Sequence, residues 1–563
     1  MPATERGARR KGWLFVAFLF AAGFAIRLKL ALTGGIWADE GLVINILAIP
    51  SLGEMIDFLR FHESHPPLFY VLLRAWQSIA GSGEVGMLSL VSFLGALIVP
   101  VAYATASRLF TARIGLLSAG LVSVSPSLVE HSAQIRPYGL LPILVLLSCF
   151  FLIGGIRHGG FVRWGLYAVF TVLLLYTHNW TWLVFGGEIV AGIFAIVRDS
   201  AGERRRRSIE FALALAGTLV LYLPWMSSLV FQVVHAGHTA PPLNSVFDRI
   251  AYVVLGIASI PYLLLLAMHP QEKVGLVLVS ATGTLLFLVT VRVVPRTIEW
   301  LNRLFPRKGE AGSSPFPGIL LIVPAATLGA AFIMSPRSNL ILERCIAMLA
   351  PLVLLAIAYG VDRLASSRNA SLRPLGYAAV VFLFLVSIAS DIALFPTTRS
   401  NAREAGQAVA AAVQPNDLVI VAPEWYAPSF NYYFPPIAEQ IDYPNPGRSG
   451  LLDFADVRTK ALDTTTTIRL MNTIAGARES GRRVWLVTAR RYLRYVDEEL
   501  PRLTTEQQRS RYTSVLRVKE ARDALVSAYG QPDTTNFVKG ALPRYEEIIP
   551  MLFVPSSGAS PRN

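Results

Sequence analysis

Apolar runs of membrane-spanning length recur from Trp13 to Leu394, and they restrict the possible folds of this chain more than any other feature of its sequence. A helix needs about 20 apolar residues to cross the hydrocarbon core of a bilayer. Charged residues make up only 16% of the 563 residues, whereas soluble domains contain roughly 25%. We therefore predict a polytopic membrane protein with a water-exposed tail that begins near Ser400.

Basic clusters set the predicted orientation, because lysine and arginine concentrate in cytoplasmic loops. Arg10 and Lys11 precede the first span and Arg204–Arg207 follow the sixth, so the N-terminus is placed in the cytoplasm. Residues 251–268 contain Pro261, and we interpret them as a re-entrant or interfacial segment that does not cross fully. Eleven spans are predicted, at about residues 13–32, 85–109, 114–129, 138–156, 162–177, 180–197, 209–231, 274–291, 319–334, 346–361 and 376–395.

The expected fold class is an all-α polytopic membrane domain followed by a small soluble α/β domain. The membrane domain covers residues 1–395 and includes a long first outer loop at 33–84, and the soluble domain covers 396–563. Apolar strands are expected at 418–421 and 483–488 of that domain. Eleven crossings from a cytoplasmic N-terminus place the tail outside, so we expect a multi-pass protein of the cytoplasmic membrane with an extracytoplasmic C-terminal domain.

Charge and cysteine content exclude several other classes of protein. The net charge of +14 lies in short clusters beside apolar runs, so the positive-inside rule explains it and no nucleic-acid partner is expected. Cys149 and Cys345 both lie in apolar runs, which excludes a disulfide framework and a thiolate metal site. The sequence contains no G-x-G-x-x-G and no Walker motif, so a nucleotide-gripping domain is not expected.

Two charged features lie near the predicted outer end of the first span. Asp39 and Glu40 follow it in the first outer loop, and adjacent carboxylates can supply a general base, because one ionises while its neighbour orients it. The alternative is a solvated loop with two charges. Arg27 lies within the span near that end and needs a protein partner or a lipid phosphate.

Further polar and aromatic stretches recur at predicted outer helix ends. They are His62–Tyr70, Gln134–Tyr138, Thr177–Trp180 and Glu343–Arg344. Together with the acid pair, and in this order, they resemble the GT-C glycosyltransferases. Within that superfamily they are most similar to the bacterial relatives of protein O-mannosyltransferases and of the lipid A aminoarabinose transferase. The resemblance covers roughly residues 13–395.

The resemblance implies a membrane glycosyltransferase whose donor is a sugar carried on polyprenyl phosphate among the membrane lipids. The acceptor is then a lipid, glycan or protein hydroxyl, and inverting displacement places the base and the phosphate-binding cations on opposite sides of the sugar. By similarity, Asp39 is the expected base and Glu40 its supporting carboxylate. The candidates for binding the donor phosphate or the substrate are Arg27, His65, Arg136, Tyr138, His178, Arg337 and Arg344.

Several of these candidates have alternative interpretations. His65 is a metal ligand, a phosphate contact or the polar residue before a Pro-Pro helix start. His178 is a substrate contact or a hydrogen-bonded interfacial histidine, and Tyr138 fits the aromatic belt as well as the site. No cofactor is certain, and a divalent metal at His65 is left open. A secondary transporter and a non-catalytic envelope scaffold are the alternative functions.

Overall fold

The computed structural model describes residues 3–235, 316–334, 343–445, 447–448, 450–452, 463–502, 513–533 and 543–555. These residues form two compact units. The membrane unit comprises Met1–Leu32, His65–Val230 and His238–Phe395, and the sheet unit comprises Thr33–Ser64, Phe231–Gly237 and Pro396–Asn563. Residues 33–64, which the sequence pattern places in an outer loop of the membrane domain, therefore fold with the C-terminal residues.

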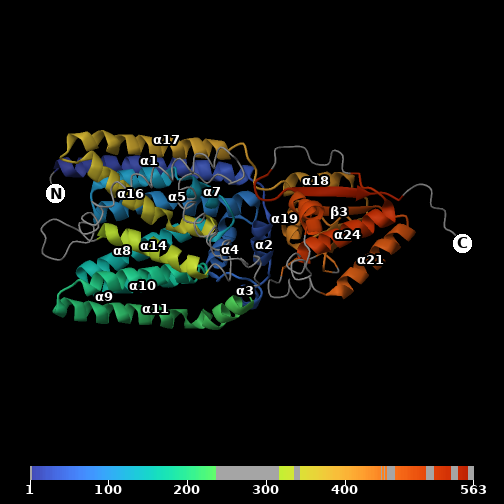
Figure 1. The fold of residues 1–563 in the computed structure, drawn as a ribbon, viewed down its shortest axis with the longest axis horizontal. Coiled ribbons are helices and arrows are strands. Elements are labelled where there is room, and N and C mark those ends of the chain that lie inside the picture. The colour runs from blue at the N-terminus through green and yellow to red at the C-terminus, as the bar shows by residue number, and fades with distance from the viewer. Residues whose placement is uncertain are drawn as a thin grey trace. The chain divides into compact units, whose positions relative to one another are not determined.

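The membrane unit is entirely helical in its described part, and its long helices run lengthwise beside one another (Figure 1). Apolar sequence favours this arrangement, because a helix satisfies its own backbone hydrogen bonds and leaves its side chains for lipid and neighbouring helices. Its helices are α1 (Ala3–Thr33), α4 (Leu68–Ala80), α5 (Glu84–Leu109), α6 (Ala112–Ser123), α7 (Pro126–His131), α8 (Leu141–His158), α9 (Phe161–Leu175), α10 (Thr181–Val197), α11 (Ala201–His235), α14 (Phe316–Met334), α15 (Glu343–Ile346), α16 (Ala350–Ala365) and α17 (Arg373–Leu394).

The described residues contain six helices long and apolar enough to cross a bilayer, and four shorter apolar helices accompany them. The chain is therefore a multi-pass membrane protein. The predicted span at 274–291 and the segment at 251–268 lie outside the described residues, so the number eleven remains a prediction.

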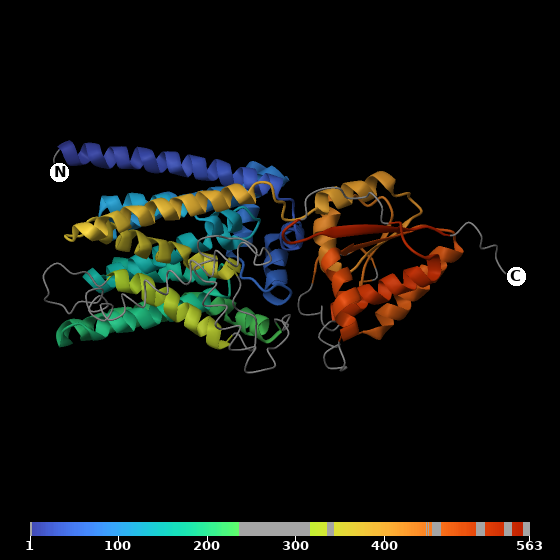
Figure 2. The same ribbon diagram turned by 45° about the horizontal axis from the view of Figure 1, so that its top comes forward.

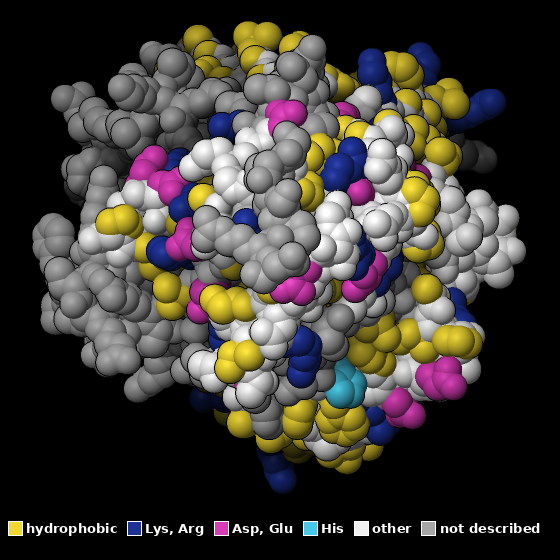
Figure 3. Space-filling model, turned by 90° about the vertical axis from the view of Figure 1, so that its right-hand side faces the viewer, with side chains coloured by type: hydrophobic (Ala, Val, Ile, Leu, Met, Phe, Trp, Pro, Cys, Tyr) yellow, Lys and Arg dark blue, Asp and Glu magenta, His cyan; other side chains and the backbone are white. Residues whose placement is uncertain are grey.

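Exposed apolar side chains on these helices mark the surfaces that lipid covers. Phe18 of α1 is 65% exposed, Leu213 of α11 is 68% exposed and Leu385 of α17 is 62% exposed. Such residues would be unfavourable in water but are stable against acyl chains. The described side chains visible in Figure 3 instead include both charges interspersed with apolar groups, as is typical of a water-exposed surface.

Small residues allow close helix packing inside the membrane unit. A Cβ on Gly155 of α8 would lie 2.7 Å from the ring of Trp164 of α9, and one on Gly192 of α10 would lie 2.6 Å from the ring of Phe211 of α11. Lipid gives helices no hydrophobic reason to associate, so close contact of this kind supplies much of the stability.

The sheet unit is an α/β structure built on a four-stranded sheet of order β2-β1-β3-β4. Strand β1 (Leu418–Val421) pairs in parallel with β2 (Glu439–Asp442) and β3 (Val484–Ala489), and β4 (Ile548–Phe553) pairs antiparallel with β3. The continuous apolar sequence of β1 fits its burial on both faces.

Helices cover the sheet on both sides (Figure 2). Helix α18 (Ala402–Ala412) lies on one side and packs with α19 (Ala427–Tyr433), while α21 (Thr464–Glu479) and α24 (Thr513–Tyr529) pack together on the other. Helices α2 (Ala38–Leu47) and α3 (Leu52–Phe61) belong to the same unit, and α2 packs against α19. This contact fixes the acid pair, which α2 carries, to the C-terminal domain.

Candidate active site

The predicted acid pair lies in the first turn of α2, in the sheet unit. Negative side chains are favourable there because backbone N–H groups and the helix dipole give the N-terminus a partial positive charge. Glu40 is fully buried; its Oε2 accepts a hydrogen bond from the Trp37 amide at 3.3 Å, and its Oε1 lies 3.6 Å from Nη2 of buried Arg399. Asp39 is only partly buried, so it is the carboxylate of the pair that remains accessible from outside.

Residues distant in sequence hold the start of α2 in place. The amides of Arg399 and Ser400 both donate to the Gly34 carbonyl, at 2.7 and 3.1 Å, and the Glu546 amide donates to the Arg399 carbonyl at 3.1 Å. Gly35 has a positive φ of 70°, and a Cβ on it would lie 2.6 Å from the Ser400 carbonyl oxygen. Only glycine fits here without strain. The backbone path that leads into α2, and so to the acid pair, therefore depends on the close contact between Gly35 and Ser400.

Glu546 is a third carboxyl at the same helix end, and it is 2% exposed. Its Oε2 accepts from the Ala38 amide at 2.8 Å and its Oε1 accepts from the Ser429 hydroxyl at 2.7 Å. Burial raises the pKa of Glu546 to about 8; the negative charge of Asp39 adds to the rise, and the hydrogen bonds oppose it. The acid that anchors α2 is therefore largely protonated at neutral pH, which spares the site a second negative charge beside that of Asp39.

The raised pKa of Glu546 gives a testable pH dependence of stability. In the unfolded chain the group titrates near its ordinary 4.5, so folding favours its protonated form. Its contribution to the free energy of unfolding is therefore complete below pH 4.5 and is lost as the pH rises through about 8. We expect the free energy of unfolding of the sheet unit to fall between pH 5 and pH 8 by roughly 1.4 kcal/mol per pH unit. Glu546→Gln should flatten that dependence.

Limited proteolysis of the intact protein across this pH range measures the effect. Glu479→Gln, at an exposed glutamate that ends α21, is the matched control and should behave as the wild type. An unchanged pH dependence in Glu546→Gln would show that Glu546 does not titrate in this window.

Predicted site residues also gather in the membrane unit. Nη2 of Arg136 lies 3.2 Å from Nε2 of His65, and the rings of His65 and His178 meet edge to face with centroids 4.7 Å apart. The Arg136 guanidinium lies 5.9 Å from the ring centre of Tyr138, and Arg344 is close enough for its charge to act on His178. We call these five residues the cation cluster. They come from the entry to α4, the turn after α7, the turn between α9 and α10, and α15.

Hydrogen bonding assigns the tautomers of the two histidines. Arginine can only donate, so Nε2 of His65 accepts from Arg136 and its proton lies on Nδ1. Nδ1 of His178 accepts from the Trp180 amide at 3.0 Å, so neutral His178 carries its proton on Nε2. Burial holds the pKa of His178 well below its usual value, and the neighbouring His65, Arg136 and Arg344 lower it further. His178 is therefore neutral at pH 7, and arginines carry the positive charge of the cluster.

Two other predicted phosphate ligands are not part of this cluster. Arg27 is fully buried, with its Nε donating to the Ser132 hydroxyl at 2.8 Å and its Nη1 to the carbonyls of Gly23 and Ser123 at 3.2 and 3.4 Å. These contacts join α1 to α6 and to the end of α7. Arg337 lies outside the described residues.

The surroundings of His65 suit an anion better than a divalent metal. Its Nε2 lone pair is occupied by the Arg136 guanidinium, whose positive charge repels another cation. Among the described residues, no group of three or more His, Cys, Asp or Glu side chains is arranged to hold a metal ion. The cluster instead offers guanidinium donors and an imidazole N–H, which are the groups that bind phosphate.

Sequence reasoning missed Glu546, Arg399 and Ser429. Glu546 lies 508 positions from Ala38, whose amide it accepts. It belongs to no motif, and no signal in the sequence links it to α2.

Comparisons with known proteins agree with this architecture. The family described as dolichyl-phosphate-mannose-protein mannosyltransferase matches residues 64–227, a segment that contains four of the five residues of the cation cluster. No curated protein sequence matches the chain.

Solved structures give the fold. ArnT from Cupriavidus metallidurans bound to undecaprenyl phosphate is 14% identical with a TM-score of 0.51, covering 86% of this chain and 95% of its own. Its apo form is 15% identical with a TM-score of 0.51, covering 87% and 95%. An Archaeoglobus fulgidus oligosaccharyltransferase in complex with Zn and sulfate is 13% identical with a TM-score of 0.49, covering 85% and 68%. The fold assignment rests on the ArnT structures.

The chain therefore has the fold of a GT-C membrane glycosyltransferase, and the resemblance seen in its sequence motifs is confirmed.

Proposed function

We propose that the protein transfers a sugar from a polyprenyl-phosphate donor to an acceptor hydroxyl on the outer face of the cytoplasmic membrane, with inversion at the anomeric carbon. The observation that carries this proposal is the cation cluster, a partly buried set of groups suited to bind phosphate, in a chain with the fold of the ArnT structures. The structure of ArnT bound to undecaprenyl phosphate supports a lipid phosphate as its ligand.

The cation cluster is suited to bind the donor phosphate and then the phosphate that leaves. Arg136 is 4% exposed, and a guanidinium excluded from water interacts with an anion much more strongly than one in solution. Arg136 and Arg344 can each present paired N–H groups to phosphate oxygens, and Nε2–H of His178 is a further donor. Negative charge grows on the bridging oxygen as the sugar departs, so these donors stabilise the transition state more than the ground state.

Asp39 is proposed as the general base for the acceptor. Its carboxylate takes the proton of the acceptor hydroxyl as that oxygen attacks the anomeric carbon. The bond from the anomeric carbon to the phosphate oxygen breaks, and the electron pair leaves with the polyprenyl phosphate. Glu40 is assigned a supporting role, because its contacts with Arg399 and the Trp37 amide hold the turn that carries Asp39.

The low pKa of His178 predicts how donor affinity depends on pH. A sugar-linked polyprenyl phosphate is a phosphodiester without a group that titrates near neutral pH. Any pH dependence of its affinity in this range therefore arises from groups of the protein. A bound anion opposes the effect of His65, Arg136 and Arg344 and raises the pKa of His178. We therefore expect affinity for polyprenyl-phosphate mannose to rise as the pH is lowered from 7.5 to 5.5, because binding of the anion and protonation of His178 favour each other.

Binding measured in nanodiscs at both pH values tests this coupling. His178→Asn should bind with little pH dependence, while His158→Asn, at the exposed end of α8, should behave as the wild type. Affinity that falls as the pH falls, or the same rise in His178→Asn, would contradict it.

The proposed orientation places the sheet unit outside the cell after eleven crossings. Both native cysteines are buried, so a cysteine introduced at exposed Ser480, in the turn after α21, should give a clean signal. We expect Ser480→Cys to react with a membrane-impermeant maleimide in intact cells. Protection until the cells are lysed would place the unit in the cytoplasm.

Sugar transfer itself is tested with radiolabelled polyprenyl-phosphate sugars, the purified protein in proteoliposomes and an envelope extract as the source of acceptors. We expect label to move from the lipid to a lipid, glycan or protein acceptor. A protein that binds these donors but never transfers label would not be the enzyme proposed.

A further inference from the structure

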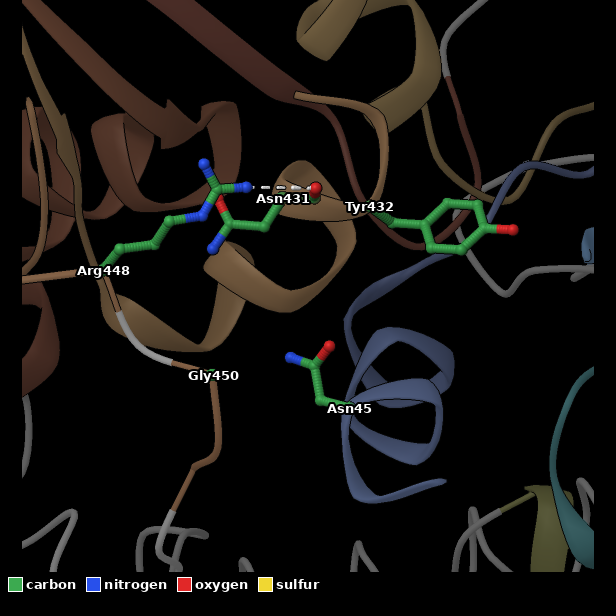
Figure 4. Close-up of a pocket in the computed structure, with 5 residues that line it drawn as sticks. All are labelled: Asn45, Asn431, Tyr432, Arg448 and Gly450. Carbon is green, nitrogen blue, oxygen red and sulfur yellow. Dashed lines mark hydrogen bonds between the residues drawn. The ribbon is translucent and has the colours of Figure 1, made fainter. Parts of the chain in front are cut away.

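A polar cavity of about 450 Å³ lies within the sheet unit beside the helix that carries Asp39 (Figure 4). It is lined by Asn45 of α2, Asn431 and Tyr432 of α19, and Arg448 and Gly450 from the segment after β2. Its volume is in the range of pockets that bind small ligands. Its lining consists of carboxamides, a guanidinium and a phenol. A packing void in a hydrophobic core would instead be lined by apolar side chains.

The walls of this cavity are fixed relative to Asp39. A Cβ on Gly41 would lie 2.6 Å from the backbone carbon of Pro428 and 2.6 Å from the amide of Ser429, so α2 and α19 are in backbone contact. Asn45 follows Gly41 by one helical turn and lies on the same face of α2. Asn45 is six residues from Asp39, a rise of roughly 9 Å along the helix. Asp39 lies about 120° around the helix from Asn45 but in the first turn of α2, so a ligand of oligosaccharide length that occupies the cavity can reach around the end of the helix and present a hydroxyl to it.

The Arg448 guanidinium is oriented before any ligand arrives. Its Nη2 donates to the carbonyls of Phe434 at 2.7 Å and Asn431 at 3.3 Å, and its guanidinium lies 5.8 Å from the centre of the Phe434 ring. Figure 4 shows it beside Asn431, across the cavity from Asn45. Within the described residues, its Nε and Nη1 donors make no hydrogen bond, although the charge of Asp442 acts on the guanidinium, so they can bind an anionic group.

The two carboxamides complement this cation. Oδ1 of Asn431 accepts from Gln440 at 2.7 Å, which fixes the amide and leaves its N–H₂ group as a donor. The Asn45 side chain points toward the cavity in Figure 4 and makes no hydrogen bond within the described part of the chain. A carboxamide both donates and accepts, which matches sugar hydroxyls, whereas Arg448 matches a carboxylate or phosphate.

We infer that this cavity is the acceptor subsite and that it binds an acidic oligosaccharide segment of the acceptor. The inference rests on the proposed function and narrows it, since it favours a glycan acceptor, or the glycan part of a lipid, over a protein hydroxyl. Binding energy gained here would hold the reacting hydroxyl near Asp39.

A glycan array probed with the fluorescently labelled, full-length protein in nanodiscs tests the subsite directly. We expect the wild type to bind a subset of acidic oligosaccharides, and Asn45→Ala and Arg448→Ala to bind them at least tenfold more weakly. Asn416→Ala and Arg469→Ala, at exposed positions of the same unit, are the matched controls and should bind as the wild type. Arg448→Lys, which keeps the positive charge and most of the length of the side chain, should retain part of the binding and guards against a loss caused by misfolding.

Transfer kinetics separate this inference from the proposed function. The subsite predicts a rise of at least tenfold in the KM for the acceptor in Asn45→Ala and Arg448→Ala, with the donor KM and kcat unchanged. If both variants transfer sugar with an unaltered acceptor KM, or if the array shows no acidic ligand, the inferred acceptor subsite is wrong. The proposed glycosyltransferase activity would not be affected by either result. If array binding depends on Asn45 and Arg448 but no sugar transfer is detected, the cavity binds acidic glycans as inferred. The proposed glycosyltransferase activity would then be wrong.

Discussion

Replacement of Asp39 by asparagine is expected to lower kcat for sugar transfer by about 10³-fold, within the range that a positioned general base contributes. Asparagine has nearly the same shape, so α2 should keep its contacts with Arg399 and Glu546. It cannot take the proton from the acceptor hydroxyl, and that proton then has no acceptor as the new bond forms. Initial rates with saturating donor and acceptor measure the effect.

The control for this experiment lies in the same unit. Asp57→Asn, at an exposed aspartate of α3, should transfer at the wild-type rate. Donor affinity in Asp39→Asn should also be unchanged, because the phosphate is assigned to the cation cluster. A folded Asp39→Asn protein with more than a tenth of the wild-type rate would remove Asp39 from the mechanism.

Replacement of Arg136 by alanine is expected to lower kcat/KM for the donor by about 10²- to 10³-fold, the cost of removing one preorganised donor from a developing negative charge. Arg136 is buried, contacts His65 and faces Tyr138, so its loss also removes the partner that orients His65. Titration of the donor at fixed acceptor concentration gives the value.

Two further variants test the reason for the loss. Arg136→Lys keeps the charge but not the planar fork, and its rate should fall between those of the wild type and Arg136→Ala. Arg108→Ala, at an exposed arginine in the last turn of α5, should leave donor kinetics unchanged. Equal kinetics for Arg136→Ala and the wild type would show that the donor phosphate lies elsewhere.

Local sequence patterns predicted most of the membrane helices. The predicted span at 85–109 is α5 (Glu84–Leu109), and the one at 180–197 is α10 (Thr181–Val197). Apolar periodicity and helix-ending residues are properties of neighbouring positions, and a helix in lipid satisfies its own backbone. The predicted span at 114–129 differs, because α6 ends at Ser123 and the short α7 begins at Pro126. Proline lacks the N–H that a continuous helix needs.

Local sequence patterns could not predict the contacts between residues that are distant in the sequence. The motifs indicated that His65, Arg136 and His178 lie at helix ends, but their mutual approach depends on how α4, α7 and α9 pack. Tyr138 is 3% exposed, whereas the rings of an aromatic belt lie at the lipid–water interface. Its contacts follow from packing that no local pattern encodes.

The acid pair shows the same limit. Glu40 stands beside Asp39 in sequence, yet one is fully buried against Arg399 and the other is partly exposed. Successive residues on a helix point about 100° apart, so only the position of the C-terminal segments decides which carboxylate is covered. Residues 33–64 read as a loop because their partners, such as Glu546, lie far along the chain.

The ³¹P spectrum of a turnover mixture tests the central claim most directly. The protein in nanodiscs is incubated with an envelope extract, a panel of polyprenyl-phosphate sugars and, separately, nucleotide sugars. We expect the phosphodiester resonance of at least one polyprenyl-phosphate sugar to be replaced by that of polyprenyl phosphate monoester, at a rate that Asp39→Asn and Arg136→Ala each lower by about 10²-fold or more. Unchanged lipid diesters alongside consumption of a nucleotide sugar would contradict the account.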